Sequence, residues 1–168
     1  LNALNSIGAS IEKKETEIVL HKREQPFKKP LNDLDLGNSG TGMRLLLGFI
    51  SGLGINATLV GDESLSKRPM LRVVEPLQDM GVKLKSNEGR APIKILESNI
   101  SDDFEYEMPI ASAQVKSSLI LASLSSNNSL RVTEPKITRN HTEKMIEYFG
   151  GDIDLSLIHI SEPTRQAE

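Results

Sequence analysis

The chain contains no cysteine and no tryptophan, and only 4% of its 168 residues are aromatic. The absence of cysteine excludes disulfide-stabilised scaffolds, thiolate zinc sites and cysteine nucleophiles. The low aromatic content, together with a net charge of -3, provides neither the stacking platforms nor the basic surface that nucleic-acid binding requires. We therefore expect no nucleic-acid partner.

Long apolar runs are missing as well. Residues 45–50 and 119–122 form the longest runs, far shorter than the roughly 18 residues that a membrane-spanning helix needs. The first residues do not show the basic-then-apolar pattern of a secretory signal. These absences predict a protein without a membrane partner, located in the cytoplasm. The first residue is Leu1 rather than methionine, so we expect the sequence to begin inside a gene.

What is present is an internal repeat. Gly8, Gly81 and Gly150 each follow an amphipathic segment and precede a short alternating run, a pattern typical of a helix that ends at glycine and leads into a strand. The spacing gives a unit of about 70 residues, too long for a solenoid module. It predicts an α/β protein, whereas two unrelated α/β stretches would leave the three glycines as a coincidence.

The order of elements within the units also recurs. Apolar residues at helical spacing predict helices near residues 43–53 and 70–80, and again near 115–124 and 142–149. A strand is predicted after the first helix of each pair, at residues 56–60 and 129–133. Because apolar side chains surround the 115–124 helix, Leu124 included, we expect it to be buried on several sides. Buried helices with sheets outside them fit this pattern.

The clearest local motif is the glycine-rich stretch at residues 35–44, directly before a predicted helix. Asn38, Gly40, Thr41 and Arg44 lie in it. Backbone N–H groups at the positive end of a helix dipole hold anions readily, so the motif suits a phosphate or a carboxylate. It lacks both the lysine of a Walker loop and the order of a dinucleotide loop.

Three further predicted helix starts carry similar chemistry. Arg68 precedes Pro69 at one of them, although a solvated loop is the ordinary explanation for Arg68 and its neighbour Lys67. Ser112, Ala113 and Gln114 open the next helix, and Arg139 precedes the last, beside a predicted capping box from Asn140 to Glu143. Together they predict a ligand with several negative charges.

These motifs carry a family resemblance over residues 1–154. The sequence resembles the 5-enolpyruvylshikimate-3-phosphate synthases, also called 3-phosphoshikimate 1-carboxyvinyltransferases, in LDLGNSGTGMRLL, GDESLSKRPM, EPLQDMG, ASAQVKSSLILASL and TRNHTEKM. The resemblance implies the enolpyruvyl transferase fold, with two domains of three βαβαββ units, buried helices and outer sheets. It also implies transfer of the enolpyruvyl group of phosphoenolpyruvate to shikimate 3-phosphate, with release of phosphate, in aromatic amino acid biosynthesis. No metal and no organic cofactor is expected.

The resemblance also assigns roles to single residues. Gly40 and Arg68 match contacts of phosphoenolpyruvate, and Gly40 matches the small residue that leaves room for the inhibitor glyphosate. Ser112, Ala113, Gln114 and Arg139 match contacts of shikimate 3-phosphate, with Gln114 reaching both substrates. Asn38, Thr41 and Arg44 belong to the signature and are possible contacts that shape the loop. No residue of this sequence matches the family's catalytic acid or base.

The match is incomplete. The family's early Lys-Ser motif and its whole second half have no counterpart, so we expect residues 1–154 to form part of one domain that is inactive without the second domain of the same polypeptide. Residues 155–168 depart from the family and resemble a translated sequencing adapter, which predicts a non-native tail. Two alternatives stay open. One is a binding module for phosphorylated metabolites without catalysis, and the other is a sister enolpyruvyl transferase, most of which use a cysteine acid.

Overall fold

One complete β-α-β-α-β-β unit occupies residues 34–98 of the computed structural model, which describes residues 1–153. The unit contains, in chain order, β3 (Leu34–Asp35), α2 (Gly40–Gly52), β4 (Ala57–Val60), the short α3 (Glu63–Ser66), α4 (Leu71–Asp79), β5 (Val82–Asn87) and β6 (Arg90–Ser98). Its order of elements is the one that the family resemblance implied, with α3 as an unpredicted addition in the loop before α4.

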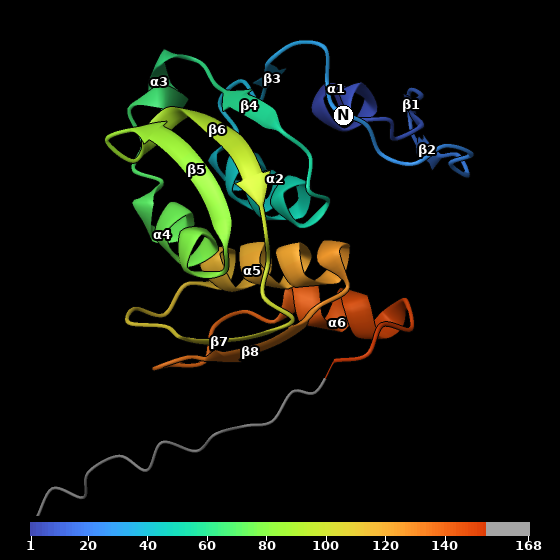
Figure 1. Cartoon of the computed structure of the whole chain (residues 1–168). Helices are drawn as coiled ribbons and strands as arrows, with labels where there is room; N and C mark the ends of the chain where they lie inside the picture. Colours follow the sequence, from blue (N-terminus) through green and yellow to red (C-terminus); the bar gives the residue numbers. More distant parts are fainter. Residues whose placement is uncertain (154–168) are drawn as a thin grey trace, which may run out of the picture.

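Two incomplete units flank the complete one (Figure 1). The N-terminal segment has the order of a unit's end, with α1 (Asn2–Ser6), β1 (Ile11–Lys13) and β2 (Ile18–Leu20). The C-terminal segment has the order of a unit's beginning, with β7 (Asp103–Glu107), α5 (Ala113–Ser126), β8 (Ser129–Thr133) and α6 (His141–Tyr148). The predicted repeat of about 70 residues is therefore confirmed.

Strand pairing repeats from unit to unit. β3 pairs in parallel with β4 across α2, and β7 pairs in parallel with β8 across α5. In the complete unit β6 then pairs antiparallel with both β4 and β5, which gives the strand order β3-β4-β6-β5. Glu88 and Gly89, both with positive φ, make the turn between β5 and β6.

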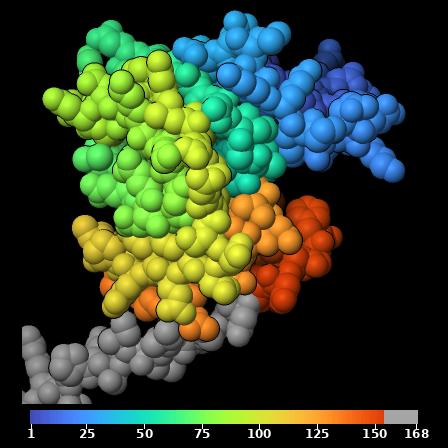
Figure 2. Space-filling view, viewed as in Figure 1, coloured from blue at the N-terminus to red at the C-terminus, as the bar shows by residue number. Residues whose placement is uncertain are grey.

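The helices lie between the sheets. Figure 1 shows α2 and α4 on the inner face of the four-stranded sheet, and α5 crossing below them with β7 and β8 on its far side. In the space-filling view, α5 and α6 (orange and red) lie below the complete unit, and the N-terminal residues (blue) lie at its upper edge (Figure 2). Buried helices with outer sheets were predicted, and this arrangement confirms the prediction.

Two glycines allow α2 and α5 to cross closely. A Cβ atom on Gly48 would lie 2.0 Å from the carbonyl oxygen of Ser118, and one on Gly52 would lie 2.1 Å from that of Ala122. Neither distance is possible for a real side chain. The hydroxyl of Ser118 also donates a hydrogen bond of 2.8 Å to the carbonyl of Arg44. This crossing fixes the start of α5 against the start of α2.

The predicted helix ends are confirmed, but the burial predicted for Leu124 was wrong. Gly8, Gly81 and Gly150 have φ values of +104°, +109° and +80° and follow α1, α4 and α6. Leu124, expected inside, is 56% exposed because it lies on the face of α5 that the described residues do not cover. The apolar stripe of α6 is likewise uncovered by residues 1–153, since Met145 and Phe149 are 58% and 76% exposed.

Some features concern only residues 1–153. No helix in this range has the length and apolarity needed to cross a membrane. The same residues contain no group of three or more acidic or histidine side chains placed to hold a metal ion. The predicted adapter-derived tail at 155–168 lies outside the described residues.

Candidate functional site

The starts of α2 and α5 are joined through side chains predicted to bind an anion. Ser39 caps α2, because its hydroxyl accepts a hydrogen bond from the backbone N–H of Gly42. Ser112 caps α5 in the same way and accepts from Val115. The two helices therefore begin where the sequence predicted, and their N-terminal dipoles lie in the same part of the molecule.

Gln114 makes the connection between them. Its Oε1 accepts a hydrogen bond of 3.0 Å from Nη1 of Arg44, and its Nε2 donates one of 2.9 Å to the hydroxyl of Thr41. Nη2 of Arg44 also donates to the carbonyl of Pro69 at 3.4 Å. Three of the predicted residues, Thr41, Arg44 and Gln114, are thus in direct contact.

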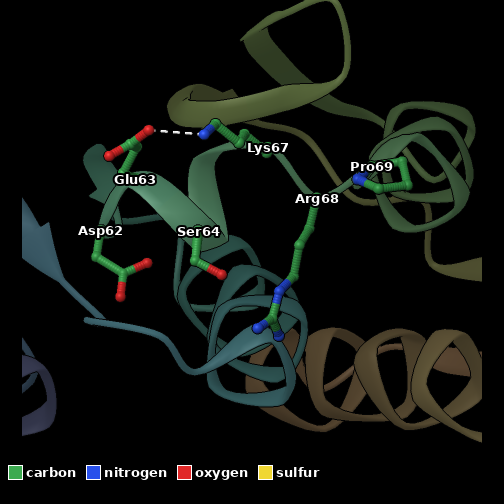
Figure 3. Close-up of a pocket in the computed structure, with 6 residues that line it drawn as sticks. All are labelled: Asp62, Glu63, Ser64, Lys67, Arg68 and Pro69. Carbon is green, nitrogen blue, oxygen red and sulfur yellow. Dashed lines mark hydrogen bonds and ion pairs between the residues drawn. The ribbon is translucent and has the colours of Figure 1, made fainter.

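Arg68 reaches the same place from the segment before α4. Figure 3 shows its side chain extending toward the start of α2, while Lys67 points away and pairs with Glu63 at 2.6 Å. Nη2 of Arg68 donates to the side-chain oxygen of Asn38. The expectation of a solvated loop residue is therefore correct for Lys67. It is wrong for Arg68, which is bonded to the glycine-rich segment.

Gly40 lies between the two arginine side chains. A Cβ atom at this position would lie 3.0 Å from Nη1 of Arg68 and 3.2 Å from Nη1 of Arg44. The lack of a side chain therefore lets two guanidinium groups approach the start of α2 closely.

The cluster carries positive charge that residues 1–153 do not neutralise. Burial lowers the pKa of the Arg44 guanidinium, and the positive charges of Arg72 and Arg68 lower it further. None of the ion pairs among residues 1–153 involves Arg44, Arg68 or Arg72. Sequence reasoning did not single out Arg72, which is an arginine like Arg44 and Arg68 and is the second residue of α4. A site of this kind is suited to binding anions.

Ser112 and Ala113 directly precede Gln114 and extend the site along the start of α5. Ser112 lines a cavity of about 190 Å³ together with Arg72 and Met108. Its backbone N–H points at the sulfur of Met108, at 3.2 Å. Glu75 lines the same cavity, so this end of the site has a hydroxyl group, a guanidinium group and a carboxylate.

Arg139 is the one predicted residue that the structure does not join to the others. It is exposed, and within residues 1–153 no hydrogen bond or ion pair connects it to them. Its neighbour Thr138, however, donates from its backbone N–H and its hydroxyl to Glu134, at 2.8 and 3.1 Å. The segment that carries Arg139 is therefore bonded to Glu134 at Thr138.

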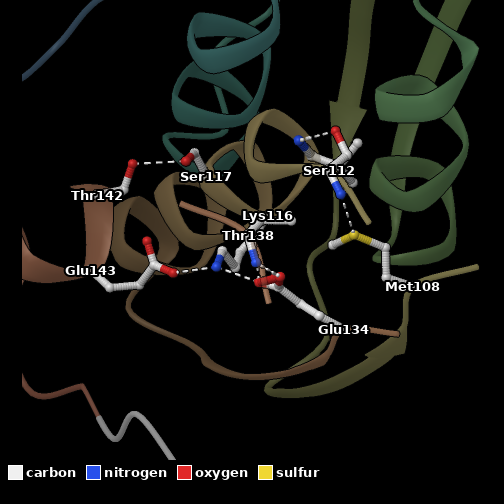
Figure 4. A network of polar contacts seen from close by, with 9 residues as sticks. Met108, Ser112, Lys116, Ser117, Glu134, Thr138, Thr142 and Glu143 are labelled. Atoms are coloured by element: carbon white, nitrogen blue, oxygen red, sulfur yellow. Dashed lines mark hydrogen bonds and ion pairs between the residues drawn. The ribbon is translucent and has the colours of Figure 1, made fainter. Parts of the chain in front are cut away.

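The predicted capping box before α6 was wrong. Asn140 is the N-cap but makes no side-chain capping bond. Glu143, expected to reach back to Asn140, instead lies 2.6 Å from Nζ of Lys116 on α5 (Figure 4). Burial explains the difference, because Glu143 is only 3% exposed and a buried carboxylate is stabilised more by a cation than by a backbone N–H.

Sequence reasoning missed this ion-pair cluster of Lys116, Glu134 and Glu143. Burial alone would lower the pKa of Lys116, but hydrogen bonds to the two carboxylates outweigh it and raise the pKa above its ordinary value. Burial alone would raise the pKa of Glu134, yet the bonds from Lys116 and Thr138 hold it below its usual range. A lone lysine among the small and apolar residues of α5 was the available signal.

Chemically, the start of α2 gathers guanidinium groups beside Gly40, and Gln114 connects this group to the start of α5. Charge-assisted hydrogen bonds from guanidinium groups are strong and directional for phosphates and carboxylates. The side chains of Arg44 and Arg68 are therefore of the type that binds an anion.

Comparison with known proteins identifies the family. The family model for EPSP synthase (3-phosphoshikimate 1-carboxyvinyltransferase) matches residues 1–161. The 3-phosphoshikimate 1-carboxyvinyltransferase of Listeria innocua serovar 6a is 42% identical over 158 residues, which are 92% of this chain and 37% of that protein. The protein of the same name from Leptospira biflexa serovar Patoc is 46% identical over 158 residues, covering 91% of this chain and 37% of its own length.

Solved structures show the same relationship. An EPSP synthase structure from Acinetobacter baumannii matches with a TM-score of 0.83 and 40% sequence identity, and the match covers 92% of this chain and 36% of that one. This chain therefore spans about 37% of the length of the curated relatives that it matches.

Proposed function

Because the chain belongs to the EPSP synthase (3-phosphoshikimate 1-carboxyvinyltransferase) family, we propose that its helix starts form part of the site where an enolpyruvyl group passes from phosphoenolpyruvate to shikimate 3-phosphate. The reaction joins the 5-hydroxyl oxygen of shikimate 3-phosphate to the enolpyruvyl carbon and releases inorganic phosphate. Both substrates carry a phosphate and a carboxylate, so the site must balance several negative charges.

The observation that carries the proposal is the arginine cluster around Gly40. Arg44 and Arg68 both lie close to this glycine, with Arg72 close enough to lower the pKa of Arg44. None of the three is paired with a carboxylate of residues 1–153. Guanidinium groups without a carboxylate partner among these residues are available to an anionic substrate.

We assign phosphoenolpyruvate to the Gly40 and Arg68 side. Shikimate 3-phosphate is assigned to Ser112, Ala113 and Gln114, with Arg139 approaching from the segment before α6. Gln114 bonds to Arg44 and Thr41 on the phosphoenolpyruvate side and follows Ala113 on the other, which supports a role for it with both substrates. Asn38, Thr41 and Arg44 support the site by orienting Arg68 and Gln114.

These residues bind, orient and neutralise charge. When phosphate leaves the tetrahedral intermediate, guanidinium groups already in place stabilise the developing charge without reorganising. Holding the two substrates side by side converts their encounter into a reaction within one complex. The catalytic acid and base are not assigned to residues 1–153, and an absence of metal and cofactor stays a prediction, as does a cytoplasmic location.

The two alternatives differ in what they need. A sister enolpyruvyl transferase that uses a cysteine acid is disfavoured, because the 168 residues contain no cysteine. A binding module without catalysis would hold both substrates but release no phosphate, so the assay below separates it from a transferase.

The test is phosphate release by a whole-length enzyme carrying this segment, with Arg68→Ala and Lys67→Ala as a matched pair of loop cations. A hydrogen bond to a charged group is worth roughly 1.5–3 kcal/mol, or about one to two decades in affinity. We expect Arg68→Ala to raise the KM for phosphoenolpyruvate by this factor, with a smaller effect on shikimate 3-phosphate. Lys67→Ala, whose partner is Glu63, should leave both constants unchanged. Equal behaviour of the two variants would contradict the assignment.

A further inference from the structure

A buried cluster of three charged side chains joins the last three elements of the described chain. Nζ of Lys116 on α5 pairs with Glu134, directly after β8, and with Oε1 of Glu143 on α6 at 2.6 Å. The three side chains are only 10%, 13% and 4% exposed, respectively. Figure 4 shows the ammonium group of Lys116 between the two carboxylates.

Each member of the cluster is bonded to a segment that carries a predicted contact of shikimate 3-phosphate. The backbone N–H of Lys116 donates to the carbonyl of Ser112 at 3.1 Å, so Lys116 lies one turn after the start of α5. Glu134 accepts both hydrogen bonds of Thr138, the residue before Arg139. Glu143 lies in the first turn of α6, which begins two residues after Arg139.

A second contact between α5 and α6 reinforces the first. The hydroxyl groups of Ser117 and Thr142 lie 2.7 Å apart, next in sequence to Lys116 and Glu143. Two neighbouring residues on each helix therefore hold α5 against α6 at their N-terminal ends. The loop from β8 to α6 is closed at the same point, by Glu134 and Thr138.

Stability alone does not account for the cluster. Removing charges from water is unfavourable, and well-packed apolar residues in place of a buried ion pair are often as stable or more so. Here one ammonium group serves two carboxylates, and Oε2 of Glu143 is buried without a partner among residues 1–153. What the cluster supplies, and apolar packing would not, is a directional connection among three segments.

Lys116 is also not available to bind a ligand directly. Its ammonium group is paired with both carboxylates, and its side chain is only 10% exposed. Any effect that it has on an anionic substrate must therefore act through the residues that it positions.

We propose that Lys116, Glu134 and Glu143 form a clamp that sets the position of Arg139 relative to Ser112, Ala113 and Gln114. The clamp keeps the two sides of the shikimate 3-phosphate site at a fixed separation before the substrate binds. Lys116 is then a positioning residue. This inference rests on the proposed function, and it assigns a role to three residues outside the set of substrate contacts.

The main test measures steady-state kinetics of a whole-length enzyme carrying this segment, with Lys116→Met and Lys136→Met compared. Lys136 lies exposed in the same loop as Thr138 and has no ion-pair partner among residues 1–153. Since small misplacements of binding groups lower rates steeply, Lys116→Met should raise the KM for shikimate 3-phosphate about tenfold. The KM for phosphoenolpyruvate should change less than about twofold, and Lys136→Met should match the unchanged enzyme.

Rescue separates positioning from general damage. Lys116→Arg keeps a cation that can serve both carboxylates, so it should recover most of the affinity for shikimate 3-phosphate. A KM for shikimate 3-phosphate that Lys116→Met leaves unchanged would overturn the clamp. Equal rises in both KM values, or no recovery with arginine, would overturn it as well, because the cluster would then be only part of the core.

A second measurement covers the case in which Lys116→Met does not fold. Glu134→Gln keeps the shape of the side chain but weakens its bonds to Lys116 and Thr138, and amide hydrogen exchange can be followed in the 168-residue chain itself. We expect exchange at the Thr138 amide to rise about tenfold or more, with no change at Gln114. Unchanged exchange at Thr138 would overturn the clamp. If the unchanged whole-length enzyme used neither substrate, the proposed function would fail, while this exchange result would still decide whether the clamp exists.

Discussion

Gln114 on α5 and Arg44 on α2, 70 positions apart in the chain, are joined by a hydrogen bond of 3.0 Å between the side-chain carbonyl and a guanidinium N–H. The same amide donates to Thr41 at 2.9 Å. Both ends of the Gln114 side chain are therefore held before any ligand binds. An amide fixed in this way presents its remaining N–H in one direction, which is how a site becomes preorganised.

We expect Gln114→Ala to raise the KM for both substrates in a whole-length enzyme carrying this segment. The change leaves Arg44 with the carbonyl of Pro69 as its remaining acceptor. It also removes a contact that we assign to phosphoenolpyruvate and shikimate 3-phosphate alike. The loss should be roughly 1–2 kcal/mol, or about five- to thirtyfold for each substrate. Gln25→Ala, in an exposed N-terminal loop, serves as the control. If only the melting temperature fell, Gln114 would be a structural helix-start residue.

Gly40→Ala tests the space between Arg44 and Arg68. The new Cβ would lie 3.0 and 3.2 Å from their Nη1 atoms, so at least one guanidinium group must move by a few tenths of an ångström. The family resemblance places glyphosate beside this glycine, and the added methyl group should reduce inhibition by glyphosate more than it reduces turnover. The measurement compares, in a whole-length enzyme, the factor by which Gly40→Ala weakens inhibition by glyphosate with the factor by which it lowers turnover. Inhibition unchanged by Gly40→Ala would contradict this placement.

Gly48→Ala tests the crossing of α2 and α5. Its Cβ would lie 2.0 Å from the carbonyl oxygen of Ser118, and backbone cannot give way as a flexible side chain can. Overpacking typically costs about 1–3 kcal/mol and exceeds the roughly 0.5–1 kcal/mol that alanine gains over glycine within a helix. The 168-residue chain should lose about 2 kcal/mol of unfolding free energy in urea titrations.

The control for this prediction is Leu124→Ala in α5, the helix that packs against Gly48. Leu124 is 56% exposed, so its removal should change the unfolding free energy by less than about 1 kcal/mol. If Gly48→Ala were as mild as Leu124→Ala, the helices would not cross as closely as described.

The sequence predicted the repeat, the main helices and strands, and the polar helix starts because these depend on local patterns. Glycines at helix ends, apolar periodicity and polar helix starts are each visible within about ten residues. It did not predict that Glu143 turns away from Asn140, because the competing partner, Lys116, lies 27 positions earlier. It also predicted burial for Leu124, since a pattern shows that a face is apolar but not which segment covers it.

The clamp residues also predict a particular pH dependence of stability. The folded-state pKa of Glu134 is lowered, so its contribution is present above the ordinary glutamate pKa of about 4.3 and is lost as pH falls through the lower, folded value. The pKa of Lys116 is raised. Its contribution is therefore complete below the ordinary lysine value of about 10.4 and is lost as pH rises through the higher, folded value.

The measurement is the unfolding free energy of the 168-residue chain and of its Lys116→Met variant from about pH 3 to pH 11. Breaking a buried pair typically costs about 3–5 kcal/mol, and we expect a constant difference near the lower end of this range between about pH 6 and 9. The difference should shrink in acid, where Glu134 becomes protonated, and again at alkaline pH, where Lys116 loses its charge. A difference independent of pH would show that Lys116 contributes through packing alone.

The 168-residue chain by itself should show no transferase activity but should retain weak anion binding. It spans about 37% of the length of its curated relatives, and the family's Lys-Ser motif and second-half acid, base and cations have no counterpart in it. Catalysis needs these groups to converge on both substrates, so we expect no phosphate release. The dipole at the start of α5 and the guanidinium group of Arg139 are nevertheless present. They should bind shikimate 3-phosphate in the millimolar range, or about 4 kcal/mol.

Cooperative unfolding of the purified chain would first establish that it folds, and NMR titration with each substrate would then locate shifts at Gly40, Ser112 and Gln114. Measurable turnover would mean that the catalytic groups lie within this segment after all.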